Sequence, residues 1–207
     1  MRSLWDSPIY ASTHVMKRID ENPPARFPAR PIDQALAPWW IAKVKPRQEK
    51  ALAFDFIKAD IEYYLPMVVH VTRRKDNNKP RKSVLPLFSG YISFCGSIPV
   101  AKGIYKTGRV VSVIEIKYQQ RFVGELTQVY QALELGAVLD PLTSAYTPGT
   151  SVSIVAGPLR GLTGVIARIQ DAERLVLSVT GLGHASMSID ASMVKPLQTI
   201  NASEISR

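Results

Sequence analysis

Three glycines stand immediately before an alternating apolar run in the stretch GPLRGLTGVIARI, residues 157–169. No Gly-Lys-Ser/Thr signature follows Gly164, and the residues after it alternate as in a strand rather than repeat as in a helix. A phosphate-binding loop is therefore not expected. We predict a hairpin in which Gly157, Gly161 and Gly164 permit a positive φ or a close approach of two backbones.

The same pattern of short apolar segments divided by turn residues continues to the end of this region. The predicted strands lie at 150–155, 164–169, 174–180, 185–190 and 193–197. An open sheet of this size would expose its edges, so a small SH3-like barrel is the economical arrangement. Because the glycines and Pro158 oppose a helix, we expect the barrel to be formed in the full-length chain too.

Residues 39–136 combine helical and strand periodicities. The predicted elements are, in order, a strand at 39–44, a helix at 47–60, a basic-tipped hairpin with strands at 61–72 and 85–94, a strand at 108–116 and a helix at 118–136. Pro46 suits the first turn of the first helix, and Gly136 suits the end of the second. Between the hairpin and the third strand, Pro99 and Gly103 indicate a loop. This order predicts an α+β fold with a mostly antiparallel sheet.

The regions outside these two domains are rich in proline or lack apolar periodicity. Residues 1–38 contain six prolines and are expected to form an extended, disordered arm. We place a linker at 137–148, the barrel domain at 149–198 and a tail at 199–207.

The charge of the chain is concentrated in the first domain. The formal net charge is +9, and residues 39–116 contain 14 Lys and Arg against 6 Asp and Glu, whereas residues 146–197 contain 4 against 3. Such an excess favours a polyanionic partner, most simply nucleic acid, although a basic surface can also serve only solubility.

Several functional classes find little support in the composition. No apolar run approaches the length that spans a bilayer, and Asp6 and Pro8 interrupt the region where a secretory signal needs its apolar core, so we expect a cytoplasmic protein without membrane contact. The single cysteine, Cys95, and three scattered histidines supply neither a metal site nor a nucleophile with its base. We expect no enzyme activity, no cofactor and no metal.

The order of motifs resembles the NusG family of transcription elongation and antitermination factors. The similarity rests on Trp39-Trp40 at the start of the first strand, on PLFSGYISF at 86–94, and on TPGTSVSIVAGPLRGLTGVIARI at 147–169, which resembles the KOW motif. Ser89 stands where the family usually has proline, and the arm is longer than the family needs. These departures resemble specialised paralogues such as RfaH and the regulators of polysaccharide operons.

The resemblance implies an NGN-like domain at 39–136 that binds the clamp helices of the largest subunit of RNA polymerase. The aromatic residues that match the family's polymerase-binding region are Trp39, Trp40, Phe88 and Tyr91. Because side chains alternate along a strand, one member of each aromatic pair is expected to be internal. The alternative is that these residues belong only to the core.

The resemblance also implies contacts with non-template DNA in the transcription bubble. The candidate nucleic-acid-binding residues are Arg47 and Lys50 on the first helix and Arg73, Arg74, Lys75, Lys79, Arg81 and Lys82 in the hairpin. A solvated charged loop is the alternative for the hairpin.

The KOW residues are Gly157, Arg160, Gly161 and Gly164, and this domain would recruit a ribosomal protein or a termination factor. The resemblance thus implies a monomeric, non-catalytic factor that rides on RNA polymerase. The other function that we consider is an RNA- or ribosome-binding KOW protein acting independently of polymerase.

Overall fold

The computed structural model describes residues 22–74, 78–142, 147–169 and 172–197. Their contacts divide the chain into two compact units: Met1–Thr127 with Val179–Gly183, and Gln128–Ser178 with His184–Arg207. Three α-helices and mostly antiparallel sheets make up the described part of the chain, so the α+β prediction is confirmed.

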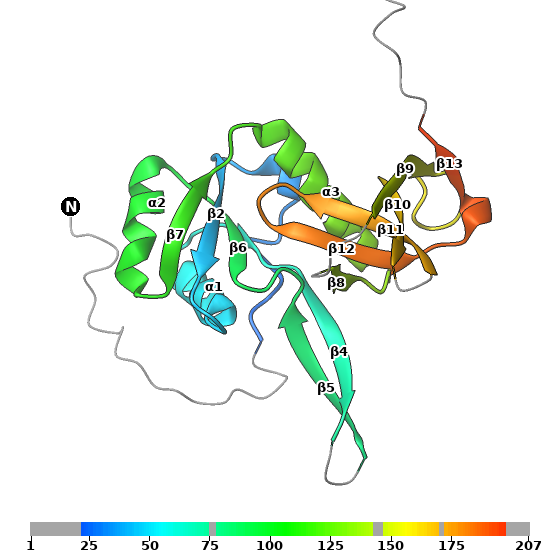
Figure 1. The fold of residues 1–207 in the computed structure, drawn as a ribbon. Helices are drawn as coiled ribbons and strands as arrows, with labels where there is room; N and C mark the ends of the chain where they lie inside the picture. The colour runs from blue at the N-terminus through cyan, green and yellow to red at the C-terminus, as the bar shows by residue number, and fades with distance from the viewer. Residues whose placement is uncertain (1–21, 75–77, 143–146, 170–171, 198–207) are drawn as a thin grey trace, which may run out of the picture. The chain divides into compact units, whose positions relative to one another are not determined.

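The first unit is built on a five-stranded sheet in the order β1-β3-β6-β2-β7 (Figure 1). Its strands are β1 (Arg26–Phe27), β3 (Tyr63–Tyr64), β6 (Tyr91–Cys95), β2 (Trp39–Val44) and β7 (Val110–Glu115). All neighbouring strands are antiparallel. The aromatic start of β2 therefore lies in the interior of the sheet, between β6 and β7.

A helical layer packs on one face of this sheet. It consists of α1 (Glu49–Lys58), α2 (Ile98–Gly103) and the short 3-10 helix η4 (Ile104–Thr107). Leu52 and Phe56 of α1 form a buried cluster with Ile92 and Phe94 of β6, as the periodicity of α1 predicts. The prediction of a loop around Pro99 was wrong, because proline is compatible with the first turn of a helix and here lies in that of α2.

The helix α3 (Gln119–Glu134) begins beside β2, the strand that carries Trp39 and Trp40. The Gln119 side chain accepts a hydrogen bond from Trp39 N at 2.8 Å and donates one to Trp39 O at 2.9 Å. Phe122 and Leu126 are buried. Gly136 follows the helix with φ of 80°, as expected of a glycine that ends a helix.

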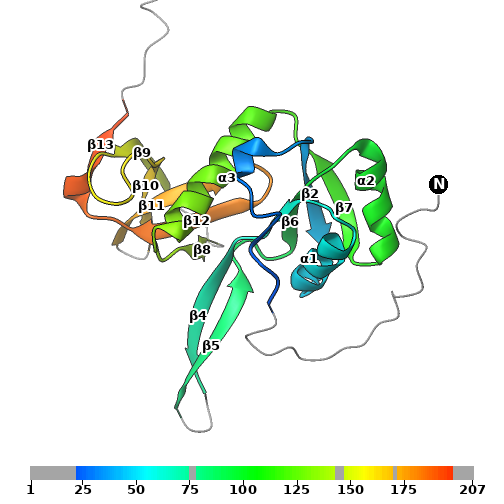
Figure 2. The ribbon, with the colours of Figure 1, turned by 180° about the vertical axis from the view of Figure 1, so that it is seen from behind.

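The basic hairpin forms a separate two-stranded sheet of β4 (Met67–Arg73) and β5 (Pro80–Pro86), which we call the ribbon. Figures 1 and 2 show it projecting from the rest of the first unit. A hairpin is present, but its predicted strands were wrong: the first covers β3 and most of β4, and the second covers only the end of β5 together with β6, so residues 80–84 of β5 lie outside both. Pro66 and Pro86 cannot donate to a ladder, and the turn at 87–90 separates β5 from β6.

Part of the predicted arm belongs to the folded unit. Residues 26 and 27 form β1 beside β3, and Ile32 is buried. The Tyr63 hydroxyl donates to Pro24 O at 2.8 Å, and Leu65 N donates to Ala25 O at 2.7 Å. The expectation of an arm extending to residue 38 was therefore wrong for residues 22–38, since prolines still offer carbonyl acceptors and apolar surface. Residues 1–21 lie outside the described residues.

The second unit is built on a six-stranded sheet in the order β13-β9-β10-β11-β12-β8. Its strands are β13 (Val194–Pro196), β9 (Thr147–Ile154), β10 (Thr163–Ile169), β11 (Ala172–Val179), β12 (Gly183–Ser188) and β8 (Asp140–Leu142). All five predicted strands are present. The sixth, β8, occupies part of the predicted linker and pairs with β12, while the predicted tail and residues 143–146 lie outside the described residues.

Candidate functional site

The turn at 87–90, within the motif PLFSGYISF, is held by a buried carboxylate of α1. Glu49 Oε1 accepts a hydrogen bond from Gly90 N at 2.7 Å, and Val44 N donates to Gly90 O at 2.7 Å. Gly90 has φ of 85°, a conformation that residues with a Cβ seldom adopt. Both backbone groups of Gly90 are thus bonded, and the flanking Phe88 and Tyr91 are fixed relative to α1.

The four candidate aromatic residues differ in exposure. Trp39 and Phe88 are buried, with 2% and 5% of their surface exposed, whereas Trp40 and Tyr91 are half-buried. The Trp40 indole packs against the helical-layer core and donates to Gly96 O at 2.8 Å. Tyr91 is therefore the aromatic side chain of this motif with the most freedom to meet a partner.

The ribbon presents two faces of different chemistry, because residues directly opposite in an antiparallel pair lie on the same side. Its polar face carries His70 opposite Ser83 and Thr72 opposite Arg81. Its valine face carries Val69 opposite Val84 and Val71 opposite Lys82.

The candidate basic residues of the ribbon lie at its far end. Arg73, Arg74, Lys79, Arg81 and Lys82 are all exposed, and Lys75 lies outside the described residues. In the described part of the chain, the side chains of Arg73, Arg81 and Lys82 make no hydrogen bond or ion pair. A cation in this state remains available to an external anion.

Lys50, by contrast, already has partners at the root of the ribbon. Its ammonium donates to Val84 O at 2.5 Å and to Asn22 Oδ1 at 2.6 Å. Burial lowers the pKa of Lys50 below its ordinary value, although the neighbouring Glu49 carboxylate opposes this. The side chain therefore ties α1 and the N-terminal segment to β5.

Arg47 does not lie on α1, contrary to the expected helix start, because α1 begins at Glu49. Arg47 is exposed, and its backbone has φ of 61°. Pro46 likewise precedes the helix. The left-handed turn at Arg47 carries the chain from β2 into α1 and leaves the guanidinium in solvent.

A partly buried ion pair joins α1 to the residue before β7. Arg109 Nε donates to Asp55 Oδ2 at 2.8 Å, and Arg109 Nη1 donates to Gln48 Oε1. Sequence reasoning missed this pair because the two charged residues are 54 positions apart.

The glycines of the 157–169 stretch serve the two purposes expected of them. Gly157 and Gly161 have φ of 78° and 96°, and a Cβ on Gly164 would lie 2.6 Å from Val176 O of β11. The close approach is thus to β11, whereas the sequence pointed to the segment that forms β9. Arg160 is exposed in the turn between the first two glycines.

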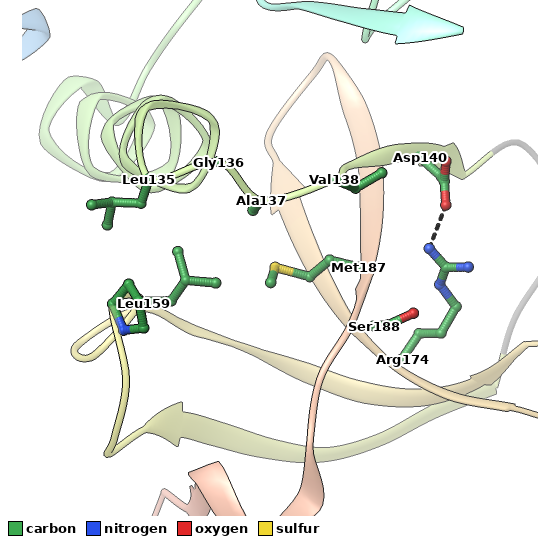
Figure 3. A pocket seen from close by; sticks show the side chains of 10 residues that line it. Leu135, Gly136, Ala137, Val138, Asp140, Leu159, Arg174, Met187 and Ser188 are labelled. Atoms are coloured by element: carbon green, nitrogen blue, oxygen red, sulfur yellow. Dashed lines mark hydrogen bonds and ion pairs between the residues drawn. The ribbon is translucent and has the colours of Figure 1, made fainter. Parts of the chain in front are cut away.

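A pocket of about 420 Å³ lies within the second unit. Figure 3 shows Leu135, Leu159 and Met187 directed into it, with the Asp140–Arg174 ion pair to one side. Sequence reasoning missed the pocket, because part of its lining comes from the predicted linker.

Residues 37–129 match the family model described as "Transcription termination factor nusG". Over this segment the chain is similar to the NusG family. No curated protein matches the chain.

The NusG match covers β2, α1, the ribbon, β6, β7 and much of α3. The candidate aromatic and basic residues all fall inside it. The glycine-rich stretch at 157–169 lies beyond it, so the KOW motif and the closed barrel stay predictions. The NusG family consists of transcription factors rather than enzymes, which supports a role in transcription.

No group of three His, Cys, Asp or Glu side chains in the described ranges could hold a metal ion. Burial raises the pKa of the Cys95 thiol, and the nearby Glu62 carboxylate raises it further, so the thiolate is disfavoured. Among the described helices, none is long and apolar enough to cross a membrane.

Proposed function

We propose that this protein is a non-catalytic transcription elongation and antitermination factor. It binds the clamp helices of RNA polymerase through its first unit and recruits a second partner through its second unit. The observation that carries this proposal is the NusG family match over residues 37–129. A factor of this kind shifts polymerase toward the elongating state only by its differential affinity for that state.

Tyr91 is the proposed polymerase contact with the clearest support. It is half-buried at the start of β6, beside a turn that Glu49 and Val44 hold at both backbone groups of Gly90. Trp40 lies on the opposite face of the sheet, where it packs against the helical-layer core, and Trp39 and Phe88 are buried. A rigid aromatic side chain is the kind of residue that dominates binding energy at protein interfaces.

The ribbon supplies the proposed nucleic-acid contact. Its exposed cations can neutralise phosphates near the upstream edge of the transcription bubble, and Arg47 adds a further cation for non-template DNA. We assign Lys50 a supporting role instead, since its ammonium already bonds to the root of the ribbon.

Retention of the full-length protein on core RNA polymerase tests the proposal. Tyr91→Ala should weaken retention about 30-fold, which corresponds to the loss of about 2 kcal/mol typical of an interface anchor. Tyr118→Ala is a matched control, because Tyr118 is an exposed tyrosine outside the motif. A large fall in the melting temperature of Tyr91→Ala would instead identify Tyr91 as a core residue.

The same experiment addresses the alternative function, an RNA- or ribosome-binding protein that acts without polymerase. The glycine-rich turn of the second unit, with its exposed Arg160, resembles a KOW motif, and this resemblance favours the alternative. Retention on ribosomes or free RNA, with no retention on polymerase, would support it and contradict the proposal above.

A further inference from the structure

The ribbon is exposed on both faces along its outer half. His70, Thr72 and Arg81 are exposed on the polar face, and Val69 and Val71 are exposed on the valine face. Ribbon residues 67–74 and 78–86 include no Asp or Glu. The positive charge of the ribbon and its exposed two-stranded shape both suit a polyanionic partner.

The side chains of the ribbon argue against a single-stranded nucleic acid. Proteins that hold single strands combine cations with aromatic side chains on which the bases stack. Residues 67–86 contain no Phe, Tyr or Trp. The ribbon therefore has the charge for a nucleic-acid backbone without the stacking platforms for unpaired bases.

The polar face has the chemistry that reads base edges in a double helix. The major groove of B-form DNA admits a two-stranded ribbon, in which Arg bonds guanine and Ser or Thr bonds any base. Thr72 and Arg81 are directly paired, as are His70 and Ser83, one pair nearer the root. These four side chains thus form a compact set of hydrogen-bonding groups on one side.

We propose that the ribbon enters the major groove of duplex DNA with its polar face toward the base edges. Arg81 and Thr72 read sequence, while Lys82 and Arg73, which lie on the valine face, contact phosphates. A-form RNA is not a suitable partner, because its major groove is too deep and narrow for side chains to read. This inference deepens the proposed nucleic-acid contact of the ribbon, and it does not depend on polymerase binding.

Selection from a pool of random-sequence duplex DNA with the full-length protein tests the proposal. One sequence should be enriched. The protein should then bind the enriched duplex about tenfold or more tightly than a scrambled duplex, either of its single strands or an RNA duplex of the same sequence, in an anisotropy assay without polymerase.

Two matched substitutions on opposite faces separate sequence reading from charge. Arg81→Ala should reduce the preference for the enriched duplex about tenfold. Lys82→Ala should weaken binding to the enriched and the scrambled duplex equally, and it should lower the slope of log affinity against log salt concentration by about 0.9. Thr72→Val, which keeps the side-chain volume, provides a second test of sequence reading and should also relax the preference. Tryptophan fluorescence checks that each variant is folded.

Failure of this inference is distinct from failure of the proposed function. If no sequence is enriched, if a single strand or the RNA duplex binds as tightly, or if Arg81→Ala and Lys82→Ala have the same effect, the ribbon does not read duplex DNA. Polymerase retention of the same preparations would still test the transcription role separately.

Discussion

The ion pair between Asp55 and Arg109 permits a sharp test of how the first unit is held together. The Asp55 side chain is 6% exposed, and Arg109 Nε lies 2.8 Å from its Oδ2. In Arg109→Met the aliphatic part of the side chain is kept and the guanidinium is lost. The carboxylate of Asp55 then stays buried in α1 without its cation, and Gln48 loses a donor as well.

The expected cost is about 3 kcal/mol of unfolding free energy. Removing one partner of a buried pair costs about 3–5 kcal/mol, because the remaining charge is uncompensated. The low end applies here, since the Arg109 side chain is 30% exposed and water can approach from its side.

The matched control is Arg121→Met, because Arg121 Nε lies 2.9 Å from Glu125 Oε1 with similar geometry. Arg121 is 72% exposed, and Glu125 also accepts hydrogen bonds from Thr180 N and Oγ1. An exposed pair of this kind contributes about 0.3–0.5 kcal/mol.

Urea unfolding followed by tryptophan fluorescence measures the difference. Trp39 and Trp40 lie in β2 of the first unit and report on its unfolding. With an m value of about 1–3 kcal/mol per molar urea, Arg109→Met should lower the midpoint by roughly 1–3 M and Arg121→Met by much less. Adding Asp55→Asn to Arg109→Met should recover part of the loss. Equal midpoints for the two single variants would refute the argument from buried charge.

Two further predictions concern glycine packing and a carboxyl pKa. Gly164→Ala should lower the free energy of unfolding by about 1–3 kcal/mol, because its Cβ would lie 2.6 Å from Val176 O. Gly124→Ala within α3 meets open space and should raise the free energy of unfolding by about 0.5–1 kcal/mol. Thermal melting compares the two variants, and a stabilised Gly164→Ala would contradict the geometry. Hydrogen bonds from the Ser192 backbone N–H and hydroxyl lower the pKa of Asp190, so its stabilising contribution is present above pH 3.8 and is lost as the pH falls through the folded-state pKa. Ser192→Ala should move that pKa partway toward 3.8 in a carboxyl NMR titration, and an unchanged value would leave the backbone bond as the whole cause.

Sequence periodicity predicted the elements whose form depends mainly on local pattern. The helix α3 and the strand β7 lie within about two residues of their expected bounds, because α3 carries a strong apolar repeat and Gly136 ends it. The strands of the second unit were found for the same reason. The turns that bound these strands contain glycines with positive φ, and glycine is a residue type that marks turns in a sequence.

Elements that depend on tertiary pairing were missed. The strands β1 and β8 are only two and three residues long, and each exists because a partner strand lies beside it. No periodicity can develop over so few residues. The helix α2 is six residues long and contains Pro99, so its composition resembles that of a loop.

Candidate site residues could be identified by type but not by surroundings. The sequence placed Lys50 and Arg47 together as exposed cations, yet one is bonded at the root of the ribbon and the other precedes the helix. Glu49 attracted no attention, although it holds Gly90 at the centre of the aromatic motif. A buried charge acquires its role from a backbone group that is distant in sequence, and only the fold brings the two together.

The root of the ribbon depends on residues outside the segment that matches the NusG family. The match begins at residue 37, whereas Asn22 shares the Lys50 ammonium with Val84 of β5. The Leu65 amide, which lies just before the ribbon, donates to Ala25 O. A fragment that began at residue 37 would leave the Leu65 amide and one Lys50 donor without these partners. Because an unpaired buried donor costs about 1–3 kcal/mol, the N-terminal segment contributes to the support of the ribbon as directly as α1 does.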